Sequence, residues 1–303
     1  MEKQNPFVIE AADVKSMTSN GFKTPIELLP SLVPTAQALA RPPISRYHVG
    51  AVGLSSDGRI FLGANLEFPN LPLHHSVHAE QFLIANAAAN TSPERPVRLE
   101  RFAVSSAPCG HCRQFLQEIR GASEIGILVT SSSAATATDD ENGEFRPLRH
   151  YLPHRFGPDD LLHKDVPLIL EPHDNRLSLI DDGGGAAAVE NGGSSSGLKE
   201  EALGAANRAH APYSRCPSGV AVMDSKGRVF AGSYLESAAY NPSLPPLQAA
   251  LVAYVAGGGG GYDEIEAAVL VEREGAPVKQ ESTVRLLLDA VSPKCDFKVF
   301  HCT

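Results

Sequence analysis

The chain carries an internal repeat, and this repeat constrains the fold more than any other feature of the sequence. The segment Pro43-Ile44-Ser45-Arg46 recurs 169 positions later as Pro212-Tyr213-Ser214-Arg215. The same offset aligns Gly58-Arg59-Ile60-Phe61 with Gly227-Arg228-Val229-Phe230, so the register holds without a gap from residue 43 to residue 67. Chance similarity between two hairpins is the alternative, but a register of this length favours a duplicated domain.

Length and low-complexity segments indicate where the two copies divide. A chain of 303 residues is long enough for two average domains. Residues 181–197 are rich in Gly, Ala and Ser, which is the composition of a flexible linker. We therefore predict a first domain at 1–171, a flexible linker at 172–197 and a second domain at 198–303. A similar stretch at 131–143 is predicted to be a solvated loop within the first domain.

Strand and helix patterns alternate in the first half. Residues 49–54 and 59–63 flank the turn signal Ser56-Asp57-Gly58, so they are predicted to form a β-hairpin. A helix, a strand, a second helix and a further strand are then predicted at 78–89, 101–105, 109–119 and 124–130. This order predicts an α/β fold with a mixed sheet covered by helices, and the repeat predicts two such domains in tandem.

Charge and composition exclude some classes of partner. Lys and Arg number 26 against 35 Asp and Glu, a formal net charge of −9, whereas nucleic-acid binding needs a basic surface. No run approaches the ~20 apolar residues of a membrane-spanning helix. The first residues lack the layout of a signal peptide, and only five cysteines are present. We therefore expect a cytoplasmic protein of the reducing cytosol, without nucleic-acid or membrane partners.

Two short segments of the first half combine into one chemical pattern. His78-Ala79-Glu80 and Pro108-Cys109-Gly110-His111-Cys112 are each weak signals, because a single His is usually structural and a lone C-x-x-C has several uses. Together they form H-x-E…P-C-x-x-C, which is the signature of zinc-dependent nucleobase deaminases.

The residue types in this pattern suit a catalytic zinc site. Such sites supply three nitrogen or sulfur ligands and leave one position open, and His78, Cys109 and Cys112 make three. The spacing of the two cysteines places both on one face of a helical first turn, where free N–H groups favour thiolates. Pro108 suits the entry to that helix. We predict one Zn²⁺ per chain.

Glu80 is the candidate catalytic residue. It stands two residues from His78 and is poorly placed to bind the same ion, but it can reach a zinc-bound water. Zinc lowers the pKa of that water toward ~7, so the water can act as the nucleophile on a ring carbon that bears an amino group. Glu80 then shuttles protons to the ring nitrogen and the leaving ammonia. The pattern predicts hydrolytic deamination.

Other candidate groups near the pattern favour structural roles. We expect His74 and His75 to be solvated or packed, and His111 to point away from the face that the two cysteines share. Arg113 could hydrogen-bond a ligand thiolate or be an ordinary surface arginine. Buried or free thiols without a matching His and Cys pattern are expected at Cys216, Cys295 and Cys302.

The sequence resembles the cytidine deaminases of the long, two-domain type, within the cytidine and deoxycytidylate deaminase superfamily. The resemblance covers nearly the whole chain and is more specific than the zinc signature alone. The residues that carry it are Pro43-Ile44-Ser45, Gly63-Ala64-Asn65-Leu66-Glu67-Phe68, Val77-His78-Ala79-Glu80-Gln81, Ala107-Pro108-Cys109-Gly110-His111-Cys112-Arg113-Gln114-Phe115 and Leu152-Pro153 with Phe156-Gly157-Pro158.

The resemblance implies a three-layer cytidine-deaminase-like fold, and conversion of the free nucleosides cytidine and 2′-deoxycytidine to uridine and 2′-deoxyuridine in pyrimidine salvage or catabolism. It implies that Asn65 and Glu67 bind the ribose, and an amide and a carboxylate suit a sugar hydroxyl. It also implies that Tyr47 flanks the base, that Phe156 covers it, and that Ala79 contacts the substrate. The implied assembly is a homodimer.

The second copy lacks the pattern. At the offset of 169, Leu247 and Ala249 stand opposite His78 and Glu80. At an offset of 172, Glu281 and Val284 stand opposite Cys109 and Cys112. We therefore expect the C-terminal domain to be a degenerate, non-catalytic copy that is retained for assembly.

Two further functions fit part of the pattern. A nucleotide or polynucleotide cytosine deaminase shares the zinc signature, but a polynucleotide enzyme needs basic and aromatic surface. This chain is acidic, has 6% aromatic residues and contains no Trp. A zinc-stabilised, non-catalytic scaffold protein is the other alternative, although a structural zinc site has no use for Glu80.

Overall fold

The computed structural model describes residues 5–19, 21–130, 143–180 and 194–303, without the side chains of 194–196. The chain divides into two compact units. The units are composed as follows: unit 1 contains Met1–Phe68, Pro72–Pro172 and Ser237–Ser243, and unit 2 contains Pro69–Leu71, His173–Glu236 and Leu244–Thr303. Each unit therefore contains a short segment that lies in sequence within the other half.

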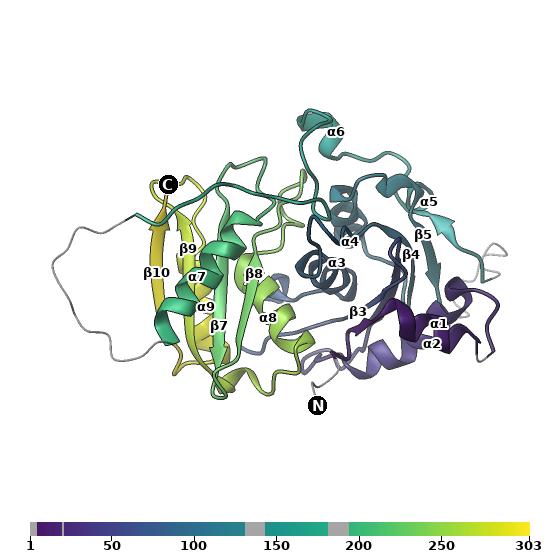
Figure 1. The fold of residues 1–303 in the computed structure, drawn as a ribbon, viewed down its shortest axis with the longest axis horizontal. Helices are drawn as coiled ribbons and strands as arrows, with labels where there is room; N and C mark the ends of the chain where they lie inside the picture. The colour runs from purple at the N-terminus through teal and green to yellow at the C-terminus, as the bar shows by residue number, and fades with distance from the viewer. Residues whose placement is uncertain (1–4, 20, 131–142, 181–193) are drawn as a thin grey trace. The chain divides into compact units, whose positions relative to one another are not determined.

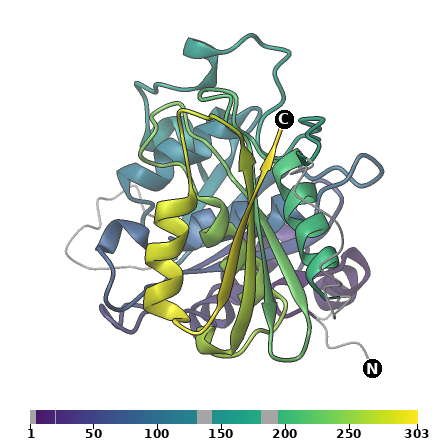
Figure 2. The same ribbon diagram turned by 90° about the vertical axis from the view of Figure 1, so that its left-hand side faces the viewer.

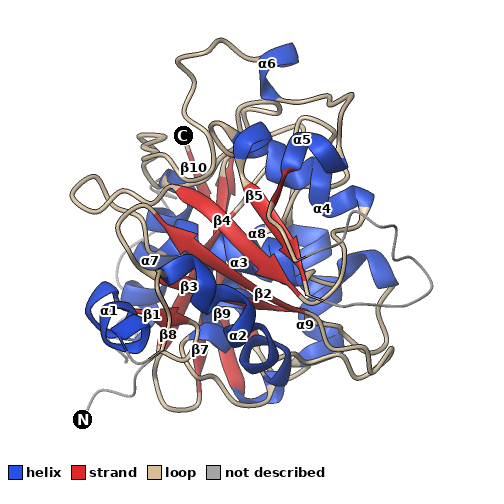
Figure 3. Cartoon of the chain, turned by 90° about the vertical axis from the view of Figure 1, so that its right-hand side faces the viewer, coloured by secondary structure: helices blue, strands red, loops and turns tan. Residues whose placement is uncertain are grey.

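Unit 1 is built on a mixed sheet. The hairpin β2 and β3 is antiparallel, β2 also pairs antiparallel with β4, and β4 pairs parallel with β5. In Figure 3 these central strands lie side by side in the order of their hydrogen bonds. The strands, in their order across the sheet, are β1 (Val8–Ile9), β3 (Ile60–Ala64), β2 (Gly50–Ser55), β4 (Leu99–Val104), β5 (Gly126–Val129) and β6 (Arg146–Pro147).

Helices cover both faces of this sheet. A Cβ atom on Gly50 would collide with the backbone of α2, and a Cβ on Gly63 would collide with the backbone of α3, so the two helices approach opposite faces closely. The core between these layers is apolar and aromatic, with Phe61, Phe82 and Phe102 fully buried. The helices of unit 1 are α1 (Ala11–Ser19), α2 (Pro25–Ala38), α3 (Ala79–Ala89), α4 (Gly110–Phe115), α5 (Leu148–Tyr151) and α6 (Pro158–Leu161).

Unit 2 repeats the same design. Gly219 and Gly232 occupy the repeat positions of Gly50 and Gly63, and a Cβ on either would meet the backbone of α7 or α8. Figure 2 shows α7 and α9 on opposite faces of the sheet. The elements of unit 2 are the strands β10 (Asp296–Cys302), β9 (Ile265–Arg273), β7 (Ser218–Asp224) and β8 (Val229–Ser233) in sheet order, and the helices α7 (Ser194–Asn207), α8 (Pro246–Ala256) and α9 (Glu281–Val291) (Figure 1).

The predicted α/β class, with mixed sheets between helical layers in two tandem copies, is confirmed. The predicted hairpin corresponds to β2 and β3, and the predicted helix at 78–89 to α3. The helix predicted at 109–119 is shorter, since α4 ends at Phe115 and a 3₁₀ turn, Leu116–Glu118, follows. The loop predicted at 131–143 lies, apart from its last residue, outside the described residues.

The predicted linker, 172–197, is described only near its ends. Leu177 packs in the apolar core of unit 2 against residues of α7 and the sheet, and α7 itself begins at Ser194. Residues 181–193 lie outside the described part of the chain. The division into domains at 1–171 and 198–303 stays a prediction.

The structure changes the alignment of the two copies after their hairpins. Leu66 bridges Val77 in unit 1, and at the matching point of unit 2 Leu235 bridges Leu244. Leu66 and Leu235 are 169 positions apart, whereas Val77 and Leu244 are only 167 apart. The loop between the bridged residues is therefore two residues shorter in the second copy. The helices α3 and α8 keep the new offset over all 11 residues.

The alignment that set Leu247 and Ala249 opposite His78 and Glu80 is therefore wrong. The structural counterparts are Pro245, the N-cap residue of α8, and Leu247. Neither Pro245 nor Leu247 can ligate a metal or carry a proton. The second copy therefore still lacks a counterpart of the ligand His78 and of the acid Glu80. No helix in the described residues is long and apolar enough to cross a membrane.

Candidate active site

Three potential metal ligands converge in unit 1. His78 Nδ1 lies 3.4 Å from Cys109 Sγ and 3.3 Å from Cys112 Sγ. The three ligand atoms all lie within 4.8 Å of one another, and no second group of this kind occurs in the described part of the chain. The structure thus brings together the residues that the sequence predicts as zinc ligands.

Two helix N-termini create this convergence. His78 is the N-cap residue of α3 and Cys109 is the N-cap residue of α4, while Cys112 lies in the first turn of α4 and is buried. Helix N-termini carry free N–H groups and a partial positive charge, which stabilise thiolates. One nitrogen and two sulfur donors, held by two helix starts, fit the preferences of Zn²⁺.

The two thiols have very different proton affinities. Hydrogen bonds with Cys112, and secondly with His78, lower the pKa of the Cys109 thiol to about 3. The same hydrogen bond with Cys109, together with burial, raises the pKa of Cys112 well above its usual value. The hydrogen bond with Cys109 also raises the pKa of His78. The centre therefore concentrates negative charge on one sulfur and is suited to a cation.

Glu80 lies beside this cluster and is almost fully buried, with 4% of its surface exposed. It is hydrogen-bonded to the Cys112 side chain, and burial raises the pKa of its carboxyl group. A carboxyl group with a raised pKa holds a proton more readily than an ordinary glutamate does, as a proton shuttle must. The geometry around Glu80 thus suits proton transfer beside the cluster.

Asn65 holds the loop that carries Tyr47. Its Nδ2 donates to Tyr47 O at 2.9 Å, and its Oδ1 accepts from Val49 N at 2.9 Å. Tyr47 is 59% exposed, and its hydroxyl lies 2.6 Å from Ser106 Oγ, in the loop that leads to Cys109. The predicted base-flanking and ribose-binding residues are therefore linked directly.

Glu67 hydrogen-bonds the turn at Ile44 and Ser45, which precedes the hairpin; we call this set of hydrogen bonds the clamp. Its carboxylate accepts hydrogen bonds from Ile44 N and Ser45 N, both at 2.9 Å, and from Ser45 Oγ. Burial acts to raise the pKa of Glu67, but the hydrogen bonds from Ser45 and Ile44 outweigh it and lower the pKa. The loop donors keep this carboxylate ionised.

Phe156 and Ala79 occupy different settings. Phe156 is 44% exposed, and its main-chain carbonyl accepts a hydrogen bond from Gln114 Nε2 at 2.5 Å, which ties its loop to α4. Ala79 is buried as the first residue of α3, and its methyl side chain has no polar group, so only its main chain could hydrogen-bond a ligand.

Gln81 has no role in the sequence prediction, yet it supports the cluster. Its Oε1 accepts from His78 N at 3.3 Å, and its Nε2 donates to Pro242 O at 3.1 Å. A Gln three residues after the N-cap residue of a helix is a recognised capping pattern, so this half of its role could have been found from the sequence. The contact with Pro242 could not.

The other groups near the motif are not ligands in this arrangement. Arg113 donates to the carbonyls of Pro108 and Tyr151 rather than to a sulfur, so it fixes the loop before Cys109. The His111 ring lies tilted beside the His78 ring, with ring centroids 5.5 Å apart, and His111 is outside the ligand cluster. The remaining residues outside it are His74, His75 and the free thiols Cys216, Cys295 and Cys302.

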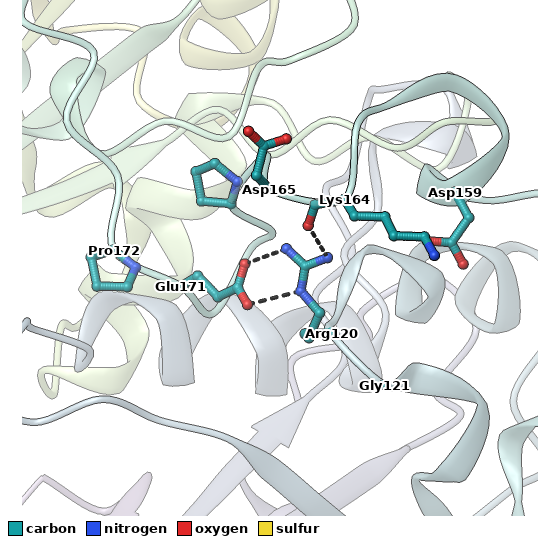
Figure 4. A pocket seen from close by; sticks show the side chains of 8 residues that line it. Arg120, Gly121, Asp159, Lys164, Asp165, Glu171 and Pro172 are labelled. Atoms are coloured by element: carbon teal, nitrogen blue, oxygen red, sulfur yellow. Dashed lines mark hydrogen bonds and ion pairs between the residues drawn. The ribbon is translucent and has the colours of Figure 1, made fainter.

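A separate hollow of unit 1, drawn in Figure 4, is not a candidate site. Arg120 points into it, and four of its five N–H groups already donate to Glu171 and to the carbonyls of Lys164 and Val166. These contacts hold the segment from Lys164 to Glu171 in place, so the role of this arginine is structural.

Comparisons with known proteins agree with this chemistry. Two family models, both described as the cytidine and deoxycytidylate deaminase zinc-binding region, match residues 24–128 and 148–285. Cytidine deaminase 1 of Arabidopsis thaliana is 59% identical over 98% of this chain and 97% of its own length, and cytidine deaminase 6 of the same plant is 50% identical over 93% and 94%. The crystal structure of cytidine deaminase from Mycobacterium tuberculosis aligns with 45% of this chain and 99% of its own, at 30% identity and a TM-score of 0.36.

Proposed function

Because the chain belongs to the cytidine and deoxycytidylate deaminase family, we propose that it is a zinc-dependent hydrolase of free nucleosides. It converts cytidine and 2′-deoxycytidine to uridine and 2′-deoxyuridine and releases ammonia. The observation that carries this proposal is the convergence of His78, Cys109 and Cys112 beside the buried carboxyl group of Glu80.

Zinc is the cofactor that this donor set fits. His78 Nδ1 and the sulfurs of Cys109 and Cys112 would hold it, and three protein ligands leave one position for a small molecule. Zinc supplies the Lewis acidity that makes water a nucleophile near neutral pH. The ligands lie at the N-termini of α3 and α4, and the partial positive charge there stabilises the cysteine thiolates that zinc binds.

Glu80 moves the protons. Its carboxylate accepts a proton from the attacking water and delivers it to the ring nitrogen N3, while the oxygen forms a bond to C4. The second proton of that water then passes through Glu80 to the exocyclic nitrogen, the C4–N bond breaks, and ammonia leaves as the C4 carbonyl forms. The raised pKa of Glu80 supports this role, because the group must be able to hold a proton between the two transfers.

The substrate-binding residues remain as the resemblance implies. Asn65 and Glu67 bind the ribose, Tyr47 and Phe156 flank and cover the base, and the main chain at Ala79 contacts the ring. The exposure of the Tyr47 and Phe156 rings supports this assignment, since both are available to an incoming ligand.

The proposal also covers the cellular compartment, the pathway and the oligomeric state. We place the enzyme in the cytosol, since all five cysteines are free of disulfides and suit a reducing compartment. We place its reaction in pyrimidine salvage because the products are uridine and 2′-deoxyuridine. We expect a homodimer, with the exposed apolar side chains Ile44 and Leu73 as candidates for burial between subunits. The net charge of −9 disfavours polynucleotide substrates.

The test pairs metal content with turnover. Purified protein should contain one Zn²⁺ per chain, convert both nucleosides in an ultraviolet assay and release one ammonia per nucleoside. Cytidine monophosphate and single-stranded oligonucleotides serve as competing substrates. Zinc-loaded protein that leaves both nucleosides unchanged would refute the proposal.

A further inference from the structure

We propose that Gln81 is a positioning residue through which the segment 237–243 of the second repeat holds the zinc ligand His78 in place. This inference rests on the proposed zinc site but not on turnover. According to this inference, a segment of the second repeat helps to position the zinc ligands, all of which belong to the first repeat.

The first step is that segment 237–243 belongs to unit 1. By sequence it follows Leu235-Glu236, which repeats Leu66-Glu67, so it is the loop after the hairpin of the second copy. By contacts it groups with unit 1, while Pro69–Leu71, from the equivalent loop of the first copy, groups with unit 2. The two copies have therefore exchanged equivalent loops.

The second step is that buried polar side chains of unit 1 bind the main chain of this segment. Glu118, fully buried, accepts a hydrogen bond from Ala238 N at 2.7 Å. Gln81, 2% exposed, donates to Pro242 O at 3.1 Å. A buried polar group that loses its partner is costly, so these two contacts fix where the segment lies.

The third step is that Gln81 also binds the ligand residue. The same side-chain amide that donates to Pro242 O accepts from His78 N. Because the amide group is planar, its two hydrogen bonds hold the segment and the N-cap residue of α3 in a fixed relation. The imidazole of that residue faces both cysteine sulfurs at 3.3–3.4 Å.

The second copy provides an internal comparison. At the structural offset of 167, the counterpart of Gln81 is Gln248, which is also buried. The counterpart of His78 is Pro245, which has no N–H to donate. Accordingly, Gln248 Oε1 has no hydrogen-bond partner among the described residues. The glutamine is present in both copies, but its link to the N-cap residue exists only where that residue is a zinc ligand.

The experiment uses full-length, zinc-loaded protein and measures zinc loss to a colorimetric chelator. Gln81→Met keeps the length of the side chain and removes both hydrogen bonds, and Gln248→Met is the matched control. We expect Gln81→Met to lose about 10- to 100-fold in zinc affinity, the range for groups that orient metal ligands. We expect Gln248→Met to retain the affinity of the parent protein. Equal zinc affinity in both variants overturns the proposal.

A second variant separates the two hydrogen bonds. In Gln81→Glu the carboxylate can still accept from His78 N but cannot donate to Pro242 O. Relative to the parent protein, we expect weaker zinc binding at pH 8. The added negative charge by itself would strengthen zinc binding, so a weaker zinc affinity in this variant must come from the lost hydrogen bond to Pro242 O. Parent-like affinity at pH 8 overturns the role of segment 237–243.

Two further readouts keep the outcomes distinct. The absorption spectrum of Co²⁺-loaded protein should change in Gln81→Met and not in Gln248→Met, because only the former alters the ligand geometry. Thermal unfolding of the metal-free forms checks that both variants fold. If the parent protein binds zinc but deaminates no nucleoside, the proposed function fails while the zinc-affinity comparison still decides the role of Gln81.

Discussion

Glu67 and Glu236 make the same three hydrogen bonds in the two copies of the fold. Each carboxylate accepts from two consecutive main-chain N–H groups and one serine hydroxyl of the turn that precedes the hairpin. The donors are Ile44 N, Ser45 N and Ser45 Oγ for Glu67, and Tyr213 N, Ser214 N and Ser214 Oγ for Glu236. Because the second copy has lost the counterparts of His78 and Glu80, the clamp shapes this turn independently of any metal chemistry.

Glu67→Gln should therefore affect two properties. An amide offers one acceptor oxygen in place of two, so the turn loosens and the thermal unfolding midpoint falls. If Glu67 also binds ribose, the KM for cytidine should rise about 10-fold or more while kcat changes little. Glu236→Gln is the control, and it should lower the unfolding midpoint without altering KM. An unchanged KM in Glu67→Gln would mean that Glu67 only stabilises the turn and does not bind the ribose.

Zinc removal should destabilise the protein. Ligand binding to the folded state adds about 2.7 kcal/mol when free zinc is 100-fold above its dissociation constant. We expect chelation to lower the unfolding midpoint, and zinc to restore it. Cys112→Ala should abolish the response to zinc, whereas Cys302→Ala, which removes a buried thiol of unit 2, should preserve it. A zinc response that survives in Cys112→Ala would argue against the assigned ligand set.

Asp224 should make stability depend on pH. Its side chain is fully buried and bonds the Arg228 guanidinium at 2.6 Å. Burial acts to raise the pKa of Asp224, but hydrogen bonds from Arg228 and Lys226 outweigh it, so the folded-state pKa lies below the unfolded value of about 3.9. This stabilisation is therefore complete above the unfolded pKa and is lost as the pH falls through the folded pKa.

Asp224→Asn should accordingly lower the unfolding free energy by about 1–3 kcal/mol at pH 7. The difference from the parent protein should shrink as the pH falls below about 4. Urea unfolding at several pH values measures both effects, with the exposed residue Asp289 changed to Asn as the control. A difference that grows toward low pH would mean that the sign of the linkage is wrong.

Local patterns made much of the fold predictable. The turn Ser56-Asp57-Gly58 located the hairpin, and the Ala-rich segment located α3, because turn chemistry and apolar periodicity act within a few residues. The ligand set was predicted from the known H-x-E…P-C-x-x-C signature, because spacing alone relates only Cys109 and Cys112, which share one helical turn. The hairpin and α3 depend on short spacings, whereas His78 is 31 residues from Cys109 in the sequence.

Features that depend on distant segments were not predictable. The two-residue shift between α3 and α8 lies in a loop whose length no periodicity constrains, so the ungapped alignment placed Leu247 wrongly. The contact of Gln81 with Pro242 joins residues 161 positions apart. Nothing in a linear pattern states that equivalent loops of two copies are exchanged, because the exchange follows from tertiary packing.

The central claim is that Glu80 transfers protons beside a zinc ion held by His78, Cys109 and Cys112. Its most direct test measures zinc content and cytidine turnover together in the parent protein, in Glu80→Gln and in the exposed control Glu100→Gln. We predict one zinc per chain in all three, parent-like turnover in Glu100→Gln, and a fall of about 10²–10⁴-fold in kcat for Glu80→Gln. Zinc-replete Glu80→Gln that deaminates cytidine at the parental rate would contradict the account.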